Sequence, residues 1–316
     1  MVDHPTVFPK TSMPSVHDYY EVFEKHAKEK MPVICICITR KFSGSLQSAT
    51  TAKDMILEEY PDAQITVIDS TVNTVLQGLY VLEACRLRDM GLEYQQIVDA
   101  LLPIRETGRI FFTIGSIDYL KHGGRIGRLA GIAASALKIK PLITLKEGEI
   151  FNSGITRNRL KSMKKVVDMT REYLDEVNAK PGEYSFCIGY GYDHNEALEF
   201  REMLKDLIKE RLGIDEIGIY QIGATIGVHT GPYPIGIGII KHALTEELKE
   251  IDIRIVEMEQ EKSVAAYWFA ARTVDLCDKE LVCCKSVLRK LEDRLKELKV
   301  QKGELEQEQM RLTVAI

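Results

Sequence analysis

Four short polar clusters contain the side chains of this chain that could do chemistry. They lie at residues 9–12 (PKTS), 42–45 (FSGS), 156–159 (TRNR) and 228–232 (VHTGP). Together they offer several hydroxyls, one imidazole and the guanidinium groups of Arg157 and Arg159, with no obvious carboxylate partner. Such donors hold a small anion well, because N–H and O–H groups hydrogen-bond to its oxygens. They are a poor set for a metal ion, so we expect no metal site.

The segment Ser43-Gly44-Ser45 follows an apolar, strand-like run and is expected to open a helix. Unpaired backbone N–H groups at a helix start carry partial positive charge and stabilise an anion placed there. The simpler interpretation is that Ser43 or Ser45 only caps the helix, and taken alone this segment favours capping. Thr11 has the same ambiguity, although Ser15 is the better cap for the helix that follows it.

The composition is that of a globular protein with an appendage. The 316 residues are enough for two compact domains and an extension, with 45% hydrophobic and 28% charged residues. A net charge of -5 argues against general affinity for nucleic acid. The seven cysteines lack a repeated C-x-x-C spacing, and Cys35 and Cys37 alternate with isoleucines as buried strand residues do. We therefore expect a reducing, cytoplasmic location.

No segment predicts a secretory signal or a membrane span. His4, Pro5 and Pro9 interrupt the N-terminus, and no long apolar run follows them. The most apolar helix candidate, residues 126–137, is too short to cross a bilayer. We expect a soluble protein without an integral membrane segment.

The first part of the chain alternates strands and helices. Continuous apolar runs at residues 33–38 and 64–69 predict strands covered on both faces, as in a parallel sheet. Predicted helices follow Ser15, as an N-cap, and span residues 45–60, 72–90 and 94–102. This alternation predicts βαβ units and places a parallel α/β/α domain at residues 1–108.

The pattern changes after Gly108, where strands predominate and a plausible hairpin turn occurs at Glu147-Gly148. The predicted strands lie at residues 110–114, 142–145, 150–151, 184–190, 216–222 and 235–240, and the predicted helices at residues 159–177 and 194–212. This mixture predicts a second, smaller α/β domain with a mixed sheet at residues 109–242.

Residues 243–316 have the composition of a charged helical tail. They contain no proline and a single glycine, and leucines recur on one a/d register from Leu281 to Leu312. An earlier apolar register, from Leu244 to Met258, slips against the later one near residues 275–278. The slip predicts two long helices, either an antiparallel hairpin or one rod with a stutter. Such a coiled-coil extension is either a dimerising or partner-binding arm, or a tail with no part in chemistry.

Several of these polar segments fall into an ordered set of motifs between residues 9 and 241. The set comprises TSMPS (11–15), SGSLQS (43–48), VIDS (67–70), DYLKHGGRI (118–126), LKIKP (137–141), Arg157 and HTGP (229–232). In this order the motifs resemble those of the DegV family of bacterial proteins. The tyrosine-leucine-x-x-Gly-Gly-Arg and His-x-Gly-Pro motifs are specific, so chance agreement of the whole set is unexpected.

The resemblance implies a two-domain DegV-like fold, with the C-terminal coiled coil as an addition. It implies a carrier and not an enzyme, which binds a long-chain fatty acid between its domains and uses no other cofactor. Thr11, Ser43 and Gly44 would hold the carboxylate, with Arg157 and His229 as nearby basic residues. Related bacterial proteins present the carboxylate to a fatty acid kinase, which would be the partner here.

Two features depart from the family pattern. Members normally begin with a strand and its loop, several dozen residues before the run that here starts at Thr11. We therefore expect the first domain to lack an interior strand and to have unpaired sheet edges. The helical tail also lies outside the pattern, and the resemblance assigns it no role.

Two other functions stay open. A hydrolase could use Ser43 as nucleophile and His229 as base, although the chain has no G-x-S-x-G turn and no acidic residue that stands out as orienting His229. Alternatively, a degraded family member could have lost ligand binding and act mainly as an oligomerising protein through residues 243–316.

Overall fold

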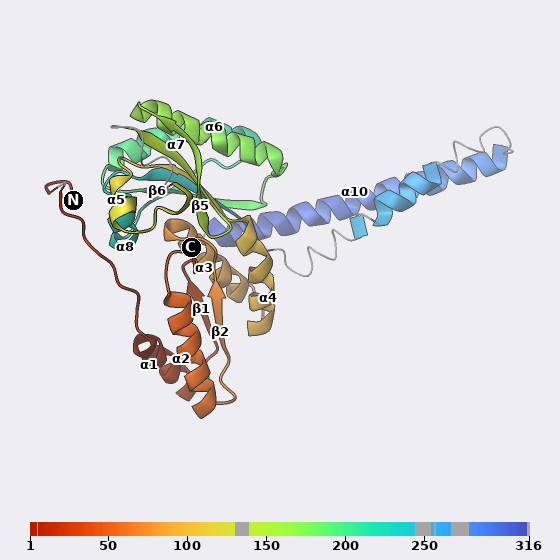
Figure 1. The fold of residues 1–316 in the computed structure, drawn as a ribbon. Coiled ribbons are helices and arrows are strands. Elements are labelled where there is room, and N and C mark those ends of the chain that lie inside the picture. The colour runs from red at the N-terminus through yellow and green to blue at the C-terminus, as the bar shows by residue number, and fades with distance from the viewer. Residues whose placement is uncertain (5, 130–138, 244–253, 256, 267–277, 315–316) are drawn as a thin grey trace. The chain divides into compact units, whose positions relative to one another are not determined.

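The computed structural model describes residues 1–4, 6–129, 139–243, 254–255, 257–266 and 278–314. The chain divides into two compact units, residues 1–243 and residues 244–316. The first unit contains two β-sheets with their helices, and the described residues of the second are helical (Figure 1). None of the helices in these described ranges is long and apolar enough to cross a membrane.

The elements of the first unit follow the order α1 (Val16–Lys28), β1 (Val33–Cys37), α2 (Ser45–Glu59), β2 (Ile65–Asp69), α3 (Thr74–Asp89), α4 (Tyr94–Ile104), the 3-10 helix η1 (Arg105–Thr107), β3 (Arg109–Thr113), α5 (Asp118–His122), the 3-10 helix η2 (Gly127–Leu129), β4 (Lys140–Lys146), β5 (Glu149–Thr156), α6 (Arg159–Glu176), β6 (Tyr184–Tyr190), α7 (His194–Leu212), β7 (Gly218–Gln221), α8 (Ala224–Thr230) and β8 (Ile235–Lys241).

The first sheet is a parallel pair of strands. β1 pairs with β2 in a register that runs from Val33 opposite Ile65 to Cys37 opposite Asp69, and α2 is the crossover between them. Ser15 and Asp18 form the expected capping box at the start of α1, which satisfies N–H groups that the helix itself leaves unpaired. Small and apolar residues of α1 and α2 pack on these strands. The buried members of this core are Phe23, Ala27, Cys37, Ala49, Ala52, Ile56 and Ile65.

The second sheet is mixed and has six strands in the order β5-β4-β3-β8-β6-β7. Only β6 and β7 are parallel, and the other neighbouring pairs are antiparallel. The predicted hairpin between β4 and β5 is confirmed, and its turn residues Glu147 and Gly148 both have positive φ, of 53° and 79°. Two consecutive positive φ angles match the twist of the flanking strands.

Helices cover both faces of the six-stranded sheet. In β3, Phe111 packs in the core formed with α6 and α7, whereas its neighbour Ile110 packs in the core formed with α3 and α4. β8 alternates isoleucines with Gly236 and Gly238, and a Cβ on Gly238 would lie 3.1 Å from the Cβ of Leu76. The glycines therefore let α3 approach the sheet closely and leave free space on that face.

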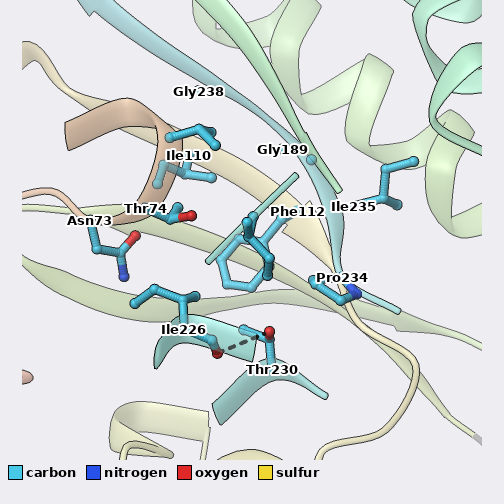
Figure 2. Close-up of a pocket in the computed structure, with 13 residues that line it drawn as sticks. Asn73, Thr74, Ile110, Phe112, Gly189, Ile226, Thr230, Pro234, Ile235 and Gly238 are labelled. Atoms are coloured by element: carbon cyan, nitrogen blue, oxygen red, sulfur yellow. Dashed lines mark hydrogen bonds between the residues drawn. The ribbon is translucent and has the colours of Figure 1, made fainter. Parts of the chain in front are cut away.

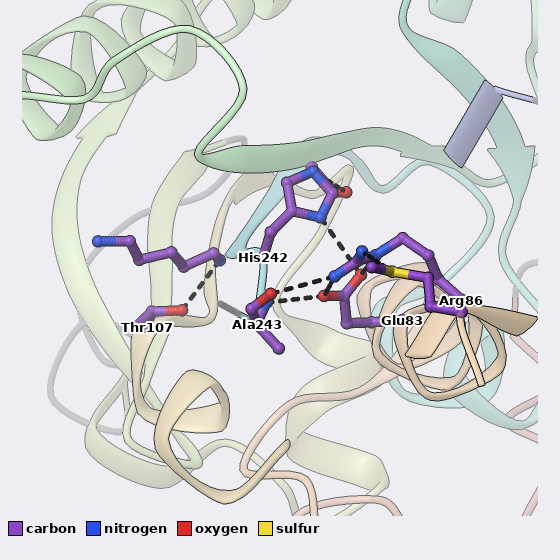
Figure 3. Close-up of polar contacts among 8 residues, drawn as sticks. Glu83, Arg86, Thr107, His242 and Ala243 are labelled. Atoms are coloured by element: carbon purple, nitrogen blue, oxygen red, sulfur yellow. Dashed lines mark hydrogen bonds and ion pairs between the residues drawn. The ribbon is translucent and has the colours of Figure 1, made fainter. Parts of the chain in front are cut away.

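A buried charged network lies where the first unit ends. Glu83 and Arg86 of α3 are 5% and 2% exposed, and the Arg86 Nε and Nη2 atoms donate to the two carboxylate oxygens of Glu83 at 2.8 and 2.6 Å. The backbone N–H of Ala243 donates to the same carboxylate at 2.7 Å, and Arg86 Nη2 donates to the Ala243 carbonyl at 3.1 Å. His242 Nδ1 lies 3.2 Å from Glu83 (Figure 3). These contacts attach the end of β8 to α3.

The sequence predicted most of these elements, and the differences are local. α4 extends two residues beyond the predicted end and contains Pro103. α8 was not predicted, because its β-branched residues and glycine disfavour a helix in isolation. Residues 127–129 of the predicted helix 126–137 form a 3-10 turn, and residues 130–138 lie outside the described residues.

The described part of the second unit comprises helical residues 254–255 and 257–266, and α10 (Asp278–Val314). Lys299 pairs with Glu259 at 2.7 Å and Lys262 pairs with Glu292 at 3.0 Å, so the two segments run antiparallel. Of the two predicted arrangements, these pairs favour the hairpin. The predicted register slip falls mainly on residues 267–277, outside the described residues.

Candidate ligand-binding site

The first unit contains a cavity of about 400 Å³. It lies where the chain before α1, the start of α2 and α8 come together, and its volume is within the range of about 300–1,000 Å³ typical of small-molecule sites. Polar side chains that line it are Thr11, Ser12, Ser43, Ser45, Asn73, Arg125, Thr225, His229 and Thr230, and apolar ones include Ile38, Phe42, Phe112, Leu120, Ile150 and Ile226. The cavity therefore suits an amphipathic ligand.

Thr11 and His229 lie together although 218 positions separate them in the chain. Thr11 Oγ1 is 3.0 Å from His229 Nε2. His229 is on α8, and its ring packs on the α5 turn so closely that a Cβ on Gly123 would lie 2.1 Å from its Nδ1. Burial, and then the positive charge of Arg125, lowers the pKa of His229. The imidazole is therefore neutral near pH 7.

Ser43 both caps the backbone and lines the cavity. The N–H of Ser45 donates to Ser43 Oγ at 3.2 Å, and the hydroxyls of Ser43 and Ser45 are 2.7 Å apart. Gly44, the N-cap of α2, also lines the cavity, and a Cβ there would lie 2.5 Å from the sulfur of Met13. The capping interpretation and the ligand interpretation are thus compatible. The start of α2 brings its partial positive charge to the cavity.

Arg157 is exposed, directly after the end of β5, and is not among the residues that line the cavity. The structure therefore brings four of the five predicted residues together, namely Thr11, Ser43, Gly44 and His229. It adds Arg125, which sequence reasoning missed as a ligand contact. The signal was present in the Gly-Gly-Arg motif, which entered the sequence analysis only as part of the family resemblance.

The cavity continues toward the six-stranded sheet. A second space of about 50 Å³ shares Asn73, Phe112, Ile226 and Thr230 with the first (Figure 2). Its other lining residues are Thr74, Val75, Ile110, Gly189, Ile222, Pro234, Ile235, Gly236 and Gly238. The glycines of β6 and β8 make this room, because they carry no side chain toward α3. An apolar chain in the cavity would reach this second space past Phe112 and Ile226.

The geometry does not assemble the parts of a serine hydrolase. His229 Nε2 contacts Thr11, and the contacts of Ser43 Oγ are with Ser45. Among the described residues, no carboxylate contacts His229, whose Nδ1 is buried without a hydrogen-bond partner. A nucleophile needs a base within hydrogen-bond reach, and the base an orienting group. No group of three or more metal-ligating side chains occurs in the described ranges either.

The comparisons with known proteins agree with this fold. The model of the family described as "Uncharacterised protein, DegV family" matches residues 2–242. The chain belongs to the DegV family. A DegV domain-containing protein of Clostridium perfringens is 32% identical over 235 residues, which are 74% of this chain and 80% of that protein.

Solved structures of the DegV family share the fold. A stearic acid-binding protein from Eubacterium ventriosum is 44% identical with a TM-score of 0.71, and the alignment covers 77% of this chain and 82% of that one. A DegV protein from Thermus thermophilus, described as fatty acid-binding, is 27% identical with a TM-score of 0.66 and the same coverage. The two-domain DegV fold predicted from the motifs is confirmed.

Proposed function

We propose that the first unit binds a long-chain fatty acid and presents its carboxylate to a partner kinase. One observation carries the proposal: a single cavity of about 400 Å³ is lined both by hydroxyls, a helix start and an imidazole and by apolar side chains. The stearic acid-binding relative from Eubacterium ventriosum, which is 44% identical, supports the choice of ligand.

The two ends of the cavity would contribute in different ways. Thr11, Ser43 and the backbone at Gly44 would donate hydrogen bonds to the carboxylate, and bonds to a charged acceptor are stronger than those between neutral groups. Each buried CH₂ group would contribute about 0.8 kcal/mol before the costs of binding. Acyl burial therefore supplies most of the affinity, and the polar end fixes the orientation.

Native mass spectrometry of the purified full-length chain tests ligand binding. We expect an adduct with the mass of a C16–C18 fatty acid, and calorimetric binding of palmitate after delipidation. The absence of both the adduct and palmitate binding would refute the proposal.

Presentation to a kinase is a separate step. Incubating the palmitate-loaded chain with a purified bacterial fatty acid kinase and ATP should yield acyl phosphate. No product with an active kinase would refute this step and leave binding untouched. Arg157, as an exposed basic residue outside the cavity lining, is proposed to act at this step. We also place the carrier in the cytoplasm, where free thiols such as Cys35 and Cys187 stay reduced.

A further inference from the structure

The outer edge of β1 carries backbone groups that the first sheet does not pair. The bonds to β2 come from residues 33, 35 and 37, as in the donation from the Val33 N–H to the Gln64 carbonyl at 2.9 Å. Successive residues of a strand point their N–H and C=O groups to opposite sides. The groups of Ile34 and Ile36, and of Ile38 directly after the strand, therefore point away from β2.

This edge is open to a further strand. Among the described residues, one contact reaches its outward groups: Gln77 Nε2 donates to the Ile36 carbonyl at 3.0 Å. A carbonyl oxygen has two lone pairs, so this bond leaves room for a second donor. A groove of about 460 Å³ borders the edge, and Ile36, Cys37 and Ile38 are among its lining residues.

β1 lacks the features by which natural edge strands avoid pairing. Such strands carry charged side chains, proline or a bulge. Residues 33–38 read VICICI, without charge or proline, and the register with β2 runs from Val33 to Cys37 without a bulge. Four of the five side chains of β1 are only partly buried. An apolar strand with these properties is expected to have a neighbour on its outer edge as well.

The sequence of this edge is the same in both directions. Residues 34–38 read ICICI, with Ile36 at the centre. Two copies related by a two-fold axis meet through the same surface on each, and an axis perpendicular to the sheet makes their strands antiparallel. With Ile36 opposite Ile36 of the second copy, Ile34 lies opposite Ile38, and their outward groups can form about six hydrogen bonds. The edge is therefore self-complementary.

We propose that β1 docks on β1 of a second copy of this chain, as an antiparallel pair centred on Ile36. The two sheets then form one four-stranded sheet, in the order β2-β1-β1-β2. The inference concerns assembly of the first unit, so it goes beyond the proposed function and does not depend on a ligand in the cavity. It is also independent of any association through residues 244–316.

The proposed register makes a specific prediction for two cysteines. Cys35 of one copy lies opposite Cys37 of the other as a non-hydrogen-bonded pair, with Cα atoms about 4.5 Å apart. This separation is within the range of about 4.4–6.8 Å that a disulfide spans. Two copies of the same cysteine lie on a diagonal, about 7–8 Å apart, which is too far for a disulfide.

Disulfide crosslinking of two variants tests the register. Within one copy the thiols of Cys35 and Cys37 are 3.8 Å apart and can link to each other, so each variant keeps only one of them. Full-length Cys35→Ser, labelled with ¹⁵N, is mixed with unlabelled Cys37→Ser. Diamide then takes up the two thiol hydrogens as the disulfide forms. Residues 31–40 are one tryptic peptide, and mass spectrometry identifies linked copies of it.

We expect a labelled–unlabelled link in about half of the copies, the statistical share of mixed pairs after subunit exchange. Each variant alone should give at least about tenfold less linked peptide, because its cysteines lie on the diagonal. Wild-type melting curves for both variants verify that they are folded.

A proline at the edge tests the hydrogen bonding. Ile34→Pro removes an N–H that points away from β2, and in both cysteine variants it should lower the yield of linked peptide at least about tenfold. Val67→Pro is the matched control, since it removes an outward N–H from the opposite edge of the same sheet, and it should keep the yield within about twofold. If Ile34→Pro does not fold, the mixture of the two cysteine variants decides alone.

Three results would overturn the inference. They are the absence of a labelled–unlabelled link in the mixture, an equal yield of linked peptide in each variant alone, and an unchanged yield in folded Ile34→Pro. The crosslink is measured without fatty acid, so its failure would leave the proposed function standing. Linked copies that bind no palmitate would instead refute the proposed function and leave this inference intact.

Discussion

Replacing Arg86 by methionine should strongly destabilise the first unit, although Arg86 lies outside the cavity lining. The change removes the guanidinium that donates twice to the buried carboxylate of Glu83 and leaves only His242 and the Ala243 N–H beside it. Removing one partner of a buried ion pair costs about 3–5 kcal/mol, because the remaining charge is left uncompensated. We expect a loss of this size in the free energy of unfolding.

The same network makes stability depend on pH. Burial alone would raise the pKa of Glu83, but hydrogen bonds from Arg86 and His242 outweigh burial and hold it at about 2. The folded pKa is thus lower than the usual value of 4.5. The carboxylate therefore contributes stability that is fully present above pH 4.5 and is lost as the pH falls toward 2. At about 1.36 kcal/mol per pH unit, this contribution is about 3 kcal/mol.

The assay is urea unfolding of the full-length chain at about pH 7, 5 and 3, where the network predicts a falling stability. Near-UV circular dichroism follows tyrosines packed in the first unit, such as Tyr80 and Tyr173. The matched control is Arg88→Met, which removes an exposed arginine of the same helix. A double change, Glu83→Gln with Arg86→Met, should cost less than Arg86→Met alone, because no unpaired charge remains. A loss below about 1 kcal/mol in Arg86→Met, or a pH profile of Glu83→Gln equal to that of wild type, would refute the reasoning.

Three further predictions concern the site and the tail. Thr11→Ala and Ser43→Ala should each weaken palmitate binding by about 0.5–3 kcal/mol in calorimetry, and unchanged affinity in both would show that these hydroxyls only satisfy the backbone and His229. Gly123→Ala should destabilise the fold by about 1–3 kcal/mol in thermal melts and weaken palmitate binding, because the added methyl group would collide with His229. Wild-type affinity for palmitate in this variant would show that the position of the His229 ring is unimportant for binding. Deleting residues 244–316 should lower the oligomeric state measured by light scattering if the tail dimerises, and an unchanged state would remove that role.

Local periodicity explains why so much of the fold was predictable. The apolar run at residues 33–38 and the helical spacing after Ser15 depend only on neighbouring residues, and both elements formed as expected. α8 was missed because its sequence disfavours a helix, which tertiary contacts then stabilise. Its packing against α5, with His229 on Gly123, involves residues more than 100 positions apart. Single-sequence patterns do not contain that information.

In the candidate site, too, the sequence identified residues but not the long-range contacts that arrange them. Thr11, Ser43 and His229 were identified through motifs, but their arrangement is a consequence of long-range contacts such as the bond between Thr11 and His229. Arg125 escaped notice because an arginine beside two glycines has no fixed direction in a sequence. Its direction follows from the Phe42 carbonyl, 83 positions away.

The contacts around His229 connect the backbone of one motif to the chemistry of another. Gly123 admits the imidazole because it has no side chain, and the Nε2 atom of that imidazole lies 3.0 Å from Thr11 Oγ1. Arg125, two residues after Gly123, donates back to the Gly123 carbonyl. A change at Gly123 would therefore disturb Thr11 and Arg125, which both line the cavity, at the same time. This coupling gives a physical reason why the Gly-Gly-Arg and His-x-Gly-Pro motifs belong to one site.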